Sequence, residues 1–165
     1  MKKLIFIRHG RAEEQIQDIS DFERSLTIKG KIISRVMAEK LKEKENPTFL
    51  IISSPAFRAL ETAIIFAREF GIESEKIVLN SKIYFKMNMH FLQDIISGLD
   101  EDIDAIALFG HNPSFTELAD RLTHNGCEFL PKSGVVGIYF NVKTWPEVIS
   151  GTGKVEYFLR PGKEQ

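Results

Sequence analysis

Short apolar runs alternate along this chain with longer segments in which apolar residues recur at a helical period. An apolar run of four to six residues is typical of a strand buried on both faces, and parallel strands need a connecting helix between them. The alternation therefore predicts a layered α/β domain with a mostly parallel central sheet. The predicted strands cover residues 4–7, 49–52, 77–79, 105–109, 135–140 and 155–159, and the last two can form a closing hairpin.

Four amphipathic segments predict the helices that connect these strands. Thr27 is in position to cap a helix that runs to about residue 41, and Gly71 follows a helix that ends near residue 70. Ser54 and Asn112 are each followed by proline, which is typical of a capping residue and the first helical position. We therefore expect helices to begin directly after Ser54 and Asn112, and a further helix over residues 91–99.

Length and composition predict one domain and exclude several classes of partner. A chain of 165 residues with 43% hydrophobic content can bury one substantial core but is short for two domains, so we expect a single domain over residues 1–165. With 22 basic and 23 acidic residues there is no overall positive field, which argues against a nucleic-acid partner. The apolar run at residues 4–7 is too short for a signal peptide or a membrane span, so we expect a cytoplasmic protein without a membrane partner.

The single cysteine, Cys127, excludes an internal disulfide and a cysteine-based zinc cluster. A metal site built from His9, His111 and nearby carboxylates is conceivable, but the chain has no pair of histidines at the spacing of a helical metal motif. We therefore expect neither a metal nor another cofactor.

Arginine and histidine residues follow three of the predicted strands. Arg8-His9-Gly10 ends the first run, Arg58 lies shortly after the second, and His111 follows the run at residues 105–109. In an open α/β sheet the carboxyl ends of parallel strands meet at one edge, where ligands bind. Two arginines, each able to donate a bidentate pair of hydrogen bonds, and two histidines therefore predict a single anion pocket.

These residue types suit phosphoryl transfer, in which catalysis consists mainly of holding the equatorial oxygens and aligning the reacting atoms. A histidine that attacks phosphorus must be neutral at the attacking nitrogen, and neighbouring arginines favour that form. His9 is the better nucleophile candidate because it ends a stiff strand. Arg8, Arg58 and His111 would then hold the phosphoryl group.

Each of these residues also has a structural interpretation when it is taken alone. His9 can pair with a backbone carbonyl at a strand end, His111 can stand at the start of a helix, and Arg58 can pair with Glu61 on a helix surface. Glu61 is in that case an orienting partner for an arginine. The joint occurrence of the three motifs favours the pocket.

The motifs Arg8-His9-Gly10, Ser54-Pro55-x-x-Arg58-Ala59-x-Glu61-Thr62 and Gly110-His111-Asn112-Pro113 resemble, in this order, those of the histidine phosphatase superfamily, also called phosphoglycerate-mutase-like. The short chain resembles most the small branch of SixA-type phosphohistidine phosphatases. The segment Asp21-x-x-Arg24-x-Leu26-Thr27-x-x-Gly30 also resembles the way that branch begins its first helix. The resemblance implies a three-layer α/β/α fold and a metal-independent reaction. In that reaction His9 is transiently phosphorylated, and Arg8, Arg58 and His111 complete the phosphate pocket.

One departure from the family pattern bears on the substrate. Larger members usually carry an acidic residue after the third strand to protonate the leaving oxygen, and residues 82–87 contain none. An imidazole leaves from a phosphohistidine more readily than an alkoxide leaves from an ester, so this gap favours a phosphohistidine substrate. Glu61, Asp21 and Glu23 are other possible sources of an acid.

We therefore expect a phosphatase that acts on a phosphorylated substrate, with a phosphohistidine-bearing signalling protein as the favoured partner. One alternative is a small-molecule phosphomonoesterase of the same superfamily, which needs a carboxylic acid over the leaving oxygen. The other is a phosphate-recognition module that binds without turnover.

Overall fold

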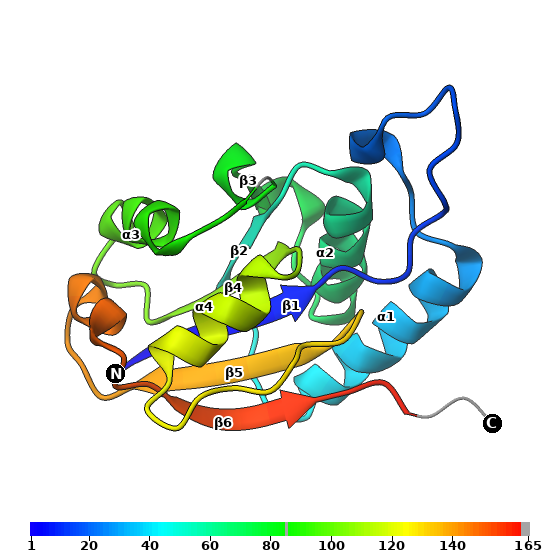
Figure 1. Ribbon diagram of the computed structural model, residues 1–165. Coiled ribbons are helices and arrows are strands. Elements are labelled where there is room, and N and C mark those ends of the chain that lie inside the picture. The colour runs from blue at the N-terminus through cyan, green and yellow to red at the C-terminus, as the bar shows by residue number, and fades with distance from the viewer. Residues whose placement is uncertain (85, 163–165) are drawn as a thin grey trace.

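A six-stranded sheet forms the middle layer of the protein in the computed structural model, which describes residues 1–84 and 86–162 (Figure 1). The strands lie side by side in the order β3-β2-β4-β1-β5-β6. Their bounds are Lys2–Arg8 for β1, Leu50–Ser53 for β2, Val78–Leu79 for β3, Ala105–Gly110 for β4, Val135–Phe140 for β5 and Lys154–Leu159 for β6. All six predicted strands are therefore present, with ends shifted by at most two residues.

The sheet is parallel in one half and antiparallel in the other. β1 pairs in parallel with β4, which in turn pairs in parallel with β2, and β2 with β3. β5 runs antiparallel to β1 and to β6, so the last two strands form the expected hairpin. The mostly parallel sheet predicted from the apolar runs is confirmed.

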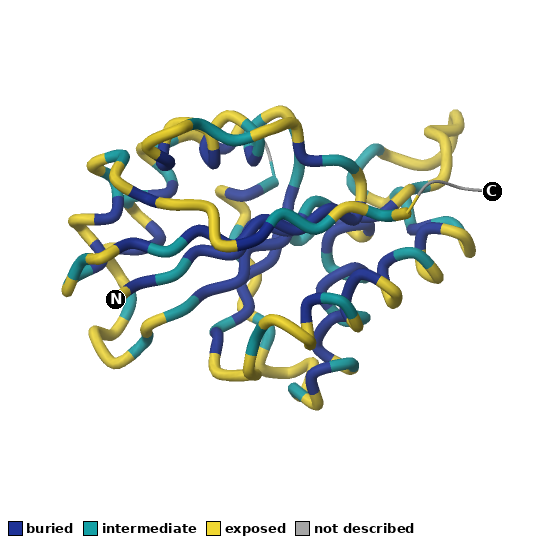
Figure 2. The backbone as a smooth tube through the Cα atoms, turned by 90° about the horizontal axis from the view of Figure 1, so that it is seen from below, coloured by how far each residue is buried: buried dark blue, intermediate teal, exposed yellow. Residues whose placement is uncertain are grey.

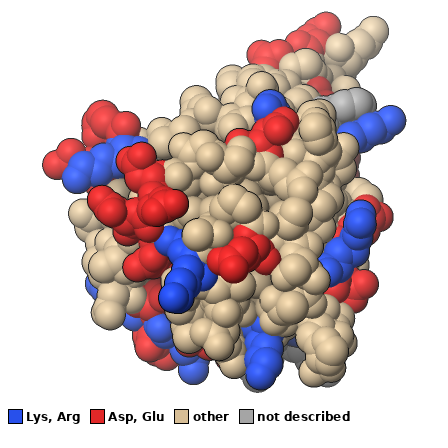
Figure 3. All heavy atoms as spheres, turned by 90° about the vertical axis from the view of Figure 1, so that its left-hand side faces the viewer, with Lys and Arg blue, Asp and Glu red and all other residues tan. Residues whose placement is uncertain are grey.

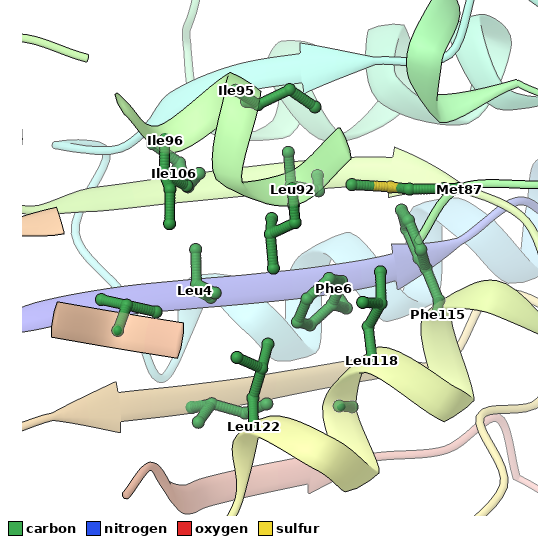
Figure 4. Packing of buried hydrophobic residues seen from close by; sticks show 14 of the residues in the cluster. Leu4, Phe6, Met87, Leu92, Ile95, Ile96, Ile106, Phe115, Leu118 and Leu122 are labelled. Atoms are coloured by element: carbon green, nitrogen blue, oxygen red, sulfur yellow. The ribbon is translucent and has the colours of Figure 1, made fainter. Parts of the chain in front are cut away.

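Helices cover both faces of the sheet. Their bounds are Ile28–Lys42 for α1, Phe57–Glu69 for α2, Met89–Ser97 for α3 and Ser114–Leu122 for α4, with 3-10 turns η1 at Asp21–Glu23, η2 at Ser74–Lys76, η3 at Ser81–Ile83 and η4 at Trp145–Ser150. Side chains alternate between the faces along β1. Leu4 and Phe6 pack with residues of α3 and α4, as Figure 4 shows, whereas Ile5 and Ile7 pack with residues of α1 and α2. The protein thus has three layers and two cores that share the sheet.

Burial follows this layering. In Figure 2 the strands run through the molecule as mostly buried backbone, and the exposed segments lie in the connections and on the outer faces of the helices. Figure 3 shows acidic and basic side chains interspersed on the face that carries α3 and η4. Within the described residues, none of the helices is both long and apolar enough to cross a membrane.

Of the three helix starts predicted from capping residues, the one at Thr27 is confirmed and those at Ser54 and Asn112 are wrong, while the helix expected over residues 91–99 begins earlier, at Met89. The Thr27 hydroxyl accepts the Gly30 N–H at 2.9 Å and caps α1, and the amide of Asn88 caps α3 in the same way. Ser54 does not cap a helix, because α2 begins only at Phe57. Pro113 does not occupy the first helical position either, because α4 begins at Ser114 after a cis Asn112–Pro113 bond. The Ser54 hydroxyl instead contacts His111, whereas Asn112 Oδ1 accepts the Thr116 N–H at 3.2 Å and Asn112 Nδ2 donates to the Leu130 carbonyl at 2.8 Å.

Candidate active site

The carboxyl ends of β1, β2 and β4 meet at one edge of the sheet. Arg8 stands beside Gly110 in the β1–β4 register, and Ser53 stands beside Phe109 in the β2–β4 register. The residues that follow these strands are therefore neighbours in space, as expected for parallel strands. They open onto a cavity of about 900 Å³ whose lining includes Arg8, His9, Arg58 and His111. The structure thus brings all four predicted site residues into one pocket.

His9 lies on the floor of this pocket with 9% of its surface exposed. Its Nδ1 atom lies 2.7 Å from the carbonyl oxygen of Gly10. A carbonyl oxygen can only accept, so Nδ1 carries the proton and the lone pair is on Nε2. Burial lowers the pKa of His9 to about 3, helped by electrostatic interactions with His111, Arg58 and Arg8 and opposed by the hydrogen bond to the Gly10 carbonyl. The ring is therefore neutral at neutral pH, as nucleophilic attack through Nε2 requires.

Gly10 joins the end of β1 to helix α2. Its N–H donates to Thr62 Oγ1 at 3.0 Å, and the Thr62 hydroxyl donates to the Arg58 carbonyl at 2.7 Å. A Cβ atom at Gly10 would lie 2.6 Å from the hydroxyl of Ser34, so only glycine fits without a shift. This connection holds His9 in a constant position relative to the first turn of the helix that carries Arg58.

Arg58 is 7% exposed and is held by one residue of the loop before α1. Its Nη1 donates to the Asp21 carbonyl at 2.8 Å, and its Nη2 donates to Asp21 Oδ2 at 3.0 Å. Asp21 also accepts from the Tyr84 hydroxyl at 2.7 Å and from Arg24 at 2.9 Å. Although partial burial opposes ionisation, these hydrogen bonds from Tyr84, Arg24 and Arg58 hold the pKa of Asp21 well below its usual range. The carboxylate thus fixes the orientation of Arg58.

The alternative in which Arg58 pairs with Glu61 is wrong. Glu61 turns toward α1, where one carboxylate oxygen accepts the Leu26 N–H at 3.3 Å and the other lies 3.8 Å from Lys31 Nζ. Helical spacing places Glu61 near Arg58, but Asp21, from the loop before α1, is the carboxylate that binds this guanidinium. Asp21 is the orienting residue that the sequence motif contained without revealing its role.

Arg8 supplies a second, half-buried cation to the pocket. One Nη atom donates to the Leu130 carbonyl at 3.2 Å, and the guanidinium lies over the Phe129 ring at 5.6 Å from its centre. Its Nε atom is buried and has no hydrogen-bond partner within residues 1–84 and 86–162. Arg8 also lines the cavity, and a guanidinium group there can bind an anion through its Nη atoms.

His111 stands opposite His9, with 5.2 Å between the ring centres. Its Nε2 atom lies 2.8 Å from the hydroxyl oxygen of Ser54. Burial lowers the pKa of His111 to about 4, and the charges of Arg58 and Arg8 add to this effect against the opposing charge of Asp21. Both histidines are therefore neutral at neutral pH, and His111 can offer an N–H to an anion only through the right tautomer.

The carboxylates proposed as acids differ in their access to the pocket. Glu23 and Glu61 do not line the cavity, whereas Asp21 does but is ionised and engaged by three donors. Tyr84, Lys86 and Met87 line the pocket from the segment without acidic residues, and Phe85 of that segment lies outside the described residues. Glu117, which sequence analysis missed, lines the pocket from the first turn of α4. In the sequence, the only indication that Glu117 lies near the pocket was its position six residues after His111.

The described residues contain no group of three or more His, Cys, Asp or Glu side chains arranged to hold a metal ion. The cavity lining includes three guanidinium groups, two imidazoles and two carboxylates, those of Arg8, Arg24, Arg58, His9, His111, Asp21 and Glu117.

Both the sequence and the fold of this chain are similar to those of known proteins. Residues 4–78 match the family model of the histidine phosphatase superfamily (branch 1). An uncharacterized protein of Picosynechococcus sp. is 27% identical over 141 residues, which cover 82% of this chain and 84% of that protein.

Three solved structures show how far the fold is shared. A SixA protein of Agrobacterium tumefaciens, described as a candidate phosphohistidine phosphatase, has a TM-score of 0.79 at 21% identity, over 97% of this chain and 98% of that chain. The protein histidine phosphatase SixA in complex with tungstate has a TM-score of 0.76 at 21% identity, over 96% and 97%. A mycobacterial glucosyl-3-phosphoglycerate phosphatase has a TM-score of 0.67 at 13% identity, over 95% and 98%. At these identities the similarity establishes a common fold.

Proposed function

We propose that this chain, whose residues 4–78 match the histidine phosphatase superfamily (branch 1), hydrolyses phosphoryl compounds through a phosphohistidine intermediate on His9. The observation that carries this proposal is the state of His9. Its ring is neutral, its Nδ1–H donates to the Gly10 carbonyl, and its Nε2 shares a pocket with Arg8, Arg58 and His111. This is the arrangement that an attacking imidazole needs.

The reaction has two steps. Nε2 of His9 attacks phosphorus, the bond from phosphorus to the leaving atom breaks, and the leaving group takes up a proton. The ring becomes positively charged as the new N–P bond forms, and the Gly10 carbonyl stabilises that charge through the Nδ1–H bond. Water then attacks phosphorus, the N–P bond breaks, and phosphate leaves with His9 restored to its neutral form.

Arg58 and Arg8 hold the phosphoryl oxygens during both steps. Guanidinium groups stay charged at any relevant pH and donate in a fixed fork, which suits the equatorial oxygens of the transferring group. Asp21 keeps Arg58 in place, and Arg8 brings a second guanidinium to the cavity lining. A SixA protein with this fold has been solved in complex with tungstate, an oxyanion, which supports the proposal that this chain binds oxyanions.

We further propose that the substrate is a phosphohistidine on a protein, as the names of two structural relatives suggest for those proteins. Asp21 is ionised and bound by Arg58, Tyr84 and Arg24, so it has no proton to give to a leaving oxygen. A leaving imidazole has much less need of one than an alkoxide. A cytoplasmic signalling protein is the partner that we expect to carry this group.

A second candidate function is supported by Glu117. This exposed carboxyl lies at the pocket wall, where it could protonate the leaving oxygen of a small phosphomonoester. A mycobacterial phosphatase of the same fold is named for such a substrate, glucosyl-3-phosphoglycerate.

Two substrates separate these functions: a histidine-phosphorylated protein and a simple alkyl phosphate. Phosphate release from each is measured with the wild-type protein and with Glu117→Gln. We expect turnover of the phosphohistidine by both proteins and little turnover of the alkyl ester. Turnover of the ester that disappears in Glu117→Gln would support the phosphomonoesterase instead. Binding of a phosphoprotein without release of phosphate would indicate a recognition module.

A further inference from the structure

The hydroxyl of Ser54 makes a contact that neither the family motif nor the proposed reaction explains. Ser54 directly follows β2, is fully buried at 0% exposure, and its Oγ lies 2.8 Å from His111 Nε2. The same Oγ accepts the Ala56 N–H at 3.2 Å. The buried Ser54 hydroxyl thus contacts both the backbone just before α2 and a histidine of the pocket.

The hydrogen atoms of this contact can be assigned by counting donors and acceptors. A serine hydroxyl has one hydrogen and two lone pairs, and the Ala56 N–H occupies one of the lone pairs. Since Ser54 is fully buried, bulk water cannot accept its hydrogen. In the part of the chain that the structure describes, His111 Nε2 is the one acceptor within hydrogen-bond distance of this hydroxyl. The Ser54 O–H therefore donates to Nε2, because the opposite arrangement leaves a buried hydroxyl hydrogen without a partner.

We propose that Ser54 is a positioning residue that fixes His111 in the tautomer with its proton on Nδ1, so that Nδ1–H is the donor offered to a phosphoryl oxygen. Burial keeps the His111 ring neutral at neutral pH, so only one ring nitrogen carries a proton there. No hydrogen-bond partner of Nδ1 exists among residues 1–84 and 86–162, and the ring lines the cavity. Fixing one nitrogen of a histidine to select the proton position on the other is a general device in active sites.

The assignment of the tautomer does not depend on the proposed function, whereas the role of Nδ1–H toward phosphate does. His9 shows the complementary arrangement, because its Nδ1–H donates to Gly10 and leaves a lone pair on Nε2. One histidine is thereby prepared to attack and the other to donate, although both rings are neutral. This difference comes from the two buried contacts. The Gly10 carbonyl can only accept a hydrogen bond from His9, whereas the Ser54 hydroxyl donates its hydrogen to His111.

The chain provides a matched control one residue away. Ser53 is also fully buried, but its hydroxyl donates to the Ser54 carbonyl at 2.8 Å and does not contact His111. Ser53→Ala removes a buried hydroxyl from the same strand end without changing the contact to Nε2. Ser54→Thr, in contrast, keeps the hydroxyl donor at the position that we propose is decisive.

The test is the 15N spectrum of the His111 ring, recorded at pH 7 by long-range 1H–15N correlation on histidine-labelled protein. We expect wild type and Ser53→Ala to show a protonated Nδ1 and an unprotonated Nε2. In Ser54→Ala we expect a shift toward the Nε2–H tautomer, which Ser54→Thr reverses. A wild-type ring protonated on Nε2, or a Ser54→Ala ring with the wild-type pattern, would overturn the proposal. If Ser54→Ala does not fold, the wild-type spectrum alone decides.

Kinetics supply a second, separate readout. We expect Ser54→Ala to lower kcat about 10- to 100-fold, by analogy with the loss of an outer hydrogen-bond partner of a functional histidine, and Ser53→Ala to stay within about twofold. The expected tautomer without any turnover would leave the inference about Ser54 intact and refute the proposed function. If the His111 tautomer changes in Ser54→Ala but kcat does not, the role of the His111 Nδ1–H toward phosphate is refuted instead.

Discussion

The Nδ1 atom of His9 lies 2.7 Å from the carbonyl oxygen of Gly10, and this contact decides which ring nitrogen can react. The strand-end histidine paired with a backbone carbonyl had been the purely structural interpretation of His9. The structure shows that pairing within the pocket itself. The hydrogen bond therefore serves the chemistry, because it directs the lone pair to Nε2 and opposes rotation of the ring.

Replacement of His9 by alanine should abolish turnover and leave the fold intact. The variant has no nucleophile, so we expect phosphate release to fall roughly 10³-fold or more. The free energy of unfolding should fall by about 1 kcal/mol, the usual net value of one hydrogen bond, because His9 borders an open pocket. Phosphate release and denaturant unfolding measure the two effects. Activity within tenfold of wild type would remove His9 from the mechanism.

Replacement of Arg58 by alanine should cost about 3 kcal/mol of transition-state stabilisation, as the loss of one preorganised donor typically does. This corresponds to a fall in kcat/KM of about 150-fold. Arg68→Ala is the matched control, since Arg68 is exposed in the last turn of the same helix and does not line the pocket. Equal kinetics of the two variants would show that Arg58 does not contact the transferring group.

Replacement of Asp21 by asparagine tests whether this residue positions Arg58. The amide keeps the shape but loses the charge that holds a buried guanidinium, and hydrogen bonds to charged groups contribute about 1.5–3 kcal/mol. We expect kcat/KM to fall at least about tenfold. Tyr84→Phe, which removes one donor to the same carboxylate, should have a smaller effect in the same direction.

Asp94→Asn is the control for this charge change. Asp94 also pairs with a cation, Lys82, at 3.0 Å, but it is exposed on α3 and does not line the cavity. Its substitution should leave kcat/KM unchanged. If Asp21→Asn behaves like Asp94→Asn, Arg58 does not need Asp21 for its orientation.

The two pocket histidines should stay neutral down to unusually low pH. Their pKa values are about 3 for His9 and about 4 for His111, against 6.5 for an exposed histidine. The unfolded chain therefore binds protons first, so the stability from the neutral buried rings is complete above pH 6.5 and is lost as the pH falls toward 3. NMR titration of the ring signals measures both values. A His9 signal that titrates near pH 6.5 would contradict the burial argument.

The same linkage predicts a difference between variants. His9→Asn has no ring that the unfolded chain can protonate in this pH range, so its free energy of unfolding should fall less between pH 6.5 and pH 4. Denaturant unfolding at several pH values measures the two slopes. Parallel slopes would mean that His9 has a similar pKa in the folded and unfolded chain.

The strands and the pocket could be predicted from the sequence because both follow from the order of the chain. Residues 4–7 and 105–109 are apolar throughout, which identifies buried parallel strands, and parallel strands must place Arg8, His9 and His111 at one edge. No knowledge of side-chain contacts was needed for these conclusions.

The roles of individual polar residues could not be predicted, because they depend on contacts between distant loops. Ser54 has the sequence pattern of a helix cap, yet its hydroxyl contacts His111, 57 residues away. Glu61 has helical spacing to Arg58, yet Asp21 from another loop binds that guanidinium. Local propensity is similar for both outcomes in each case, and only tertiary packing decides between them.

The most direct test of the account is the site of phosphorylation during turnover. The protein is mixed with a 32P-labelled phosphohistidine protein, quenched in base within milliseconds, digested and sequenced by mass spectrometry. The account predicts base-stable, acid-labile label on the Nε2 atom of His9 in wild type and no label in His9→Ala. Phosphate release at the wild-type rate with label on another residue, or with no labelled intermediate under any quench condition, would contradict it.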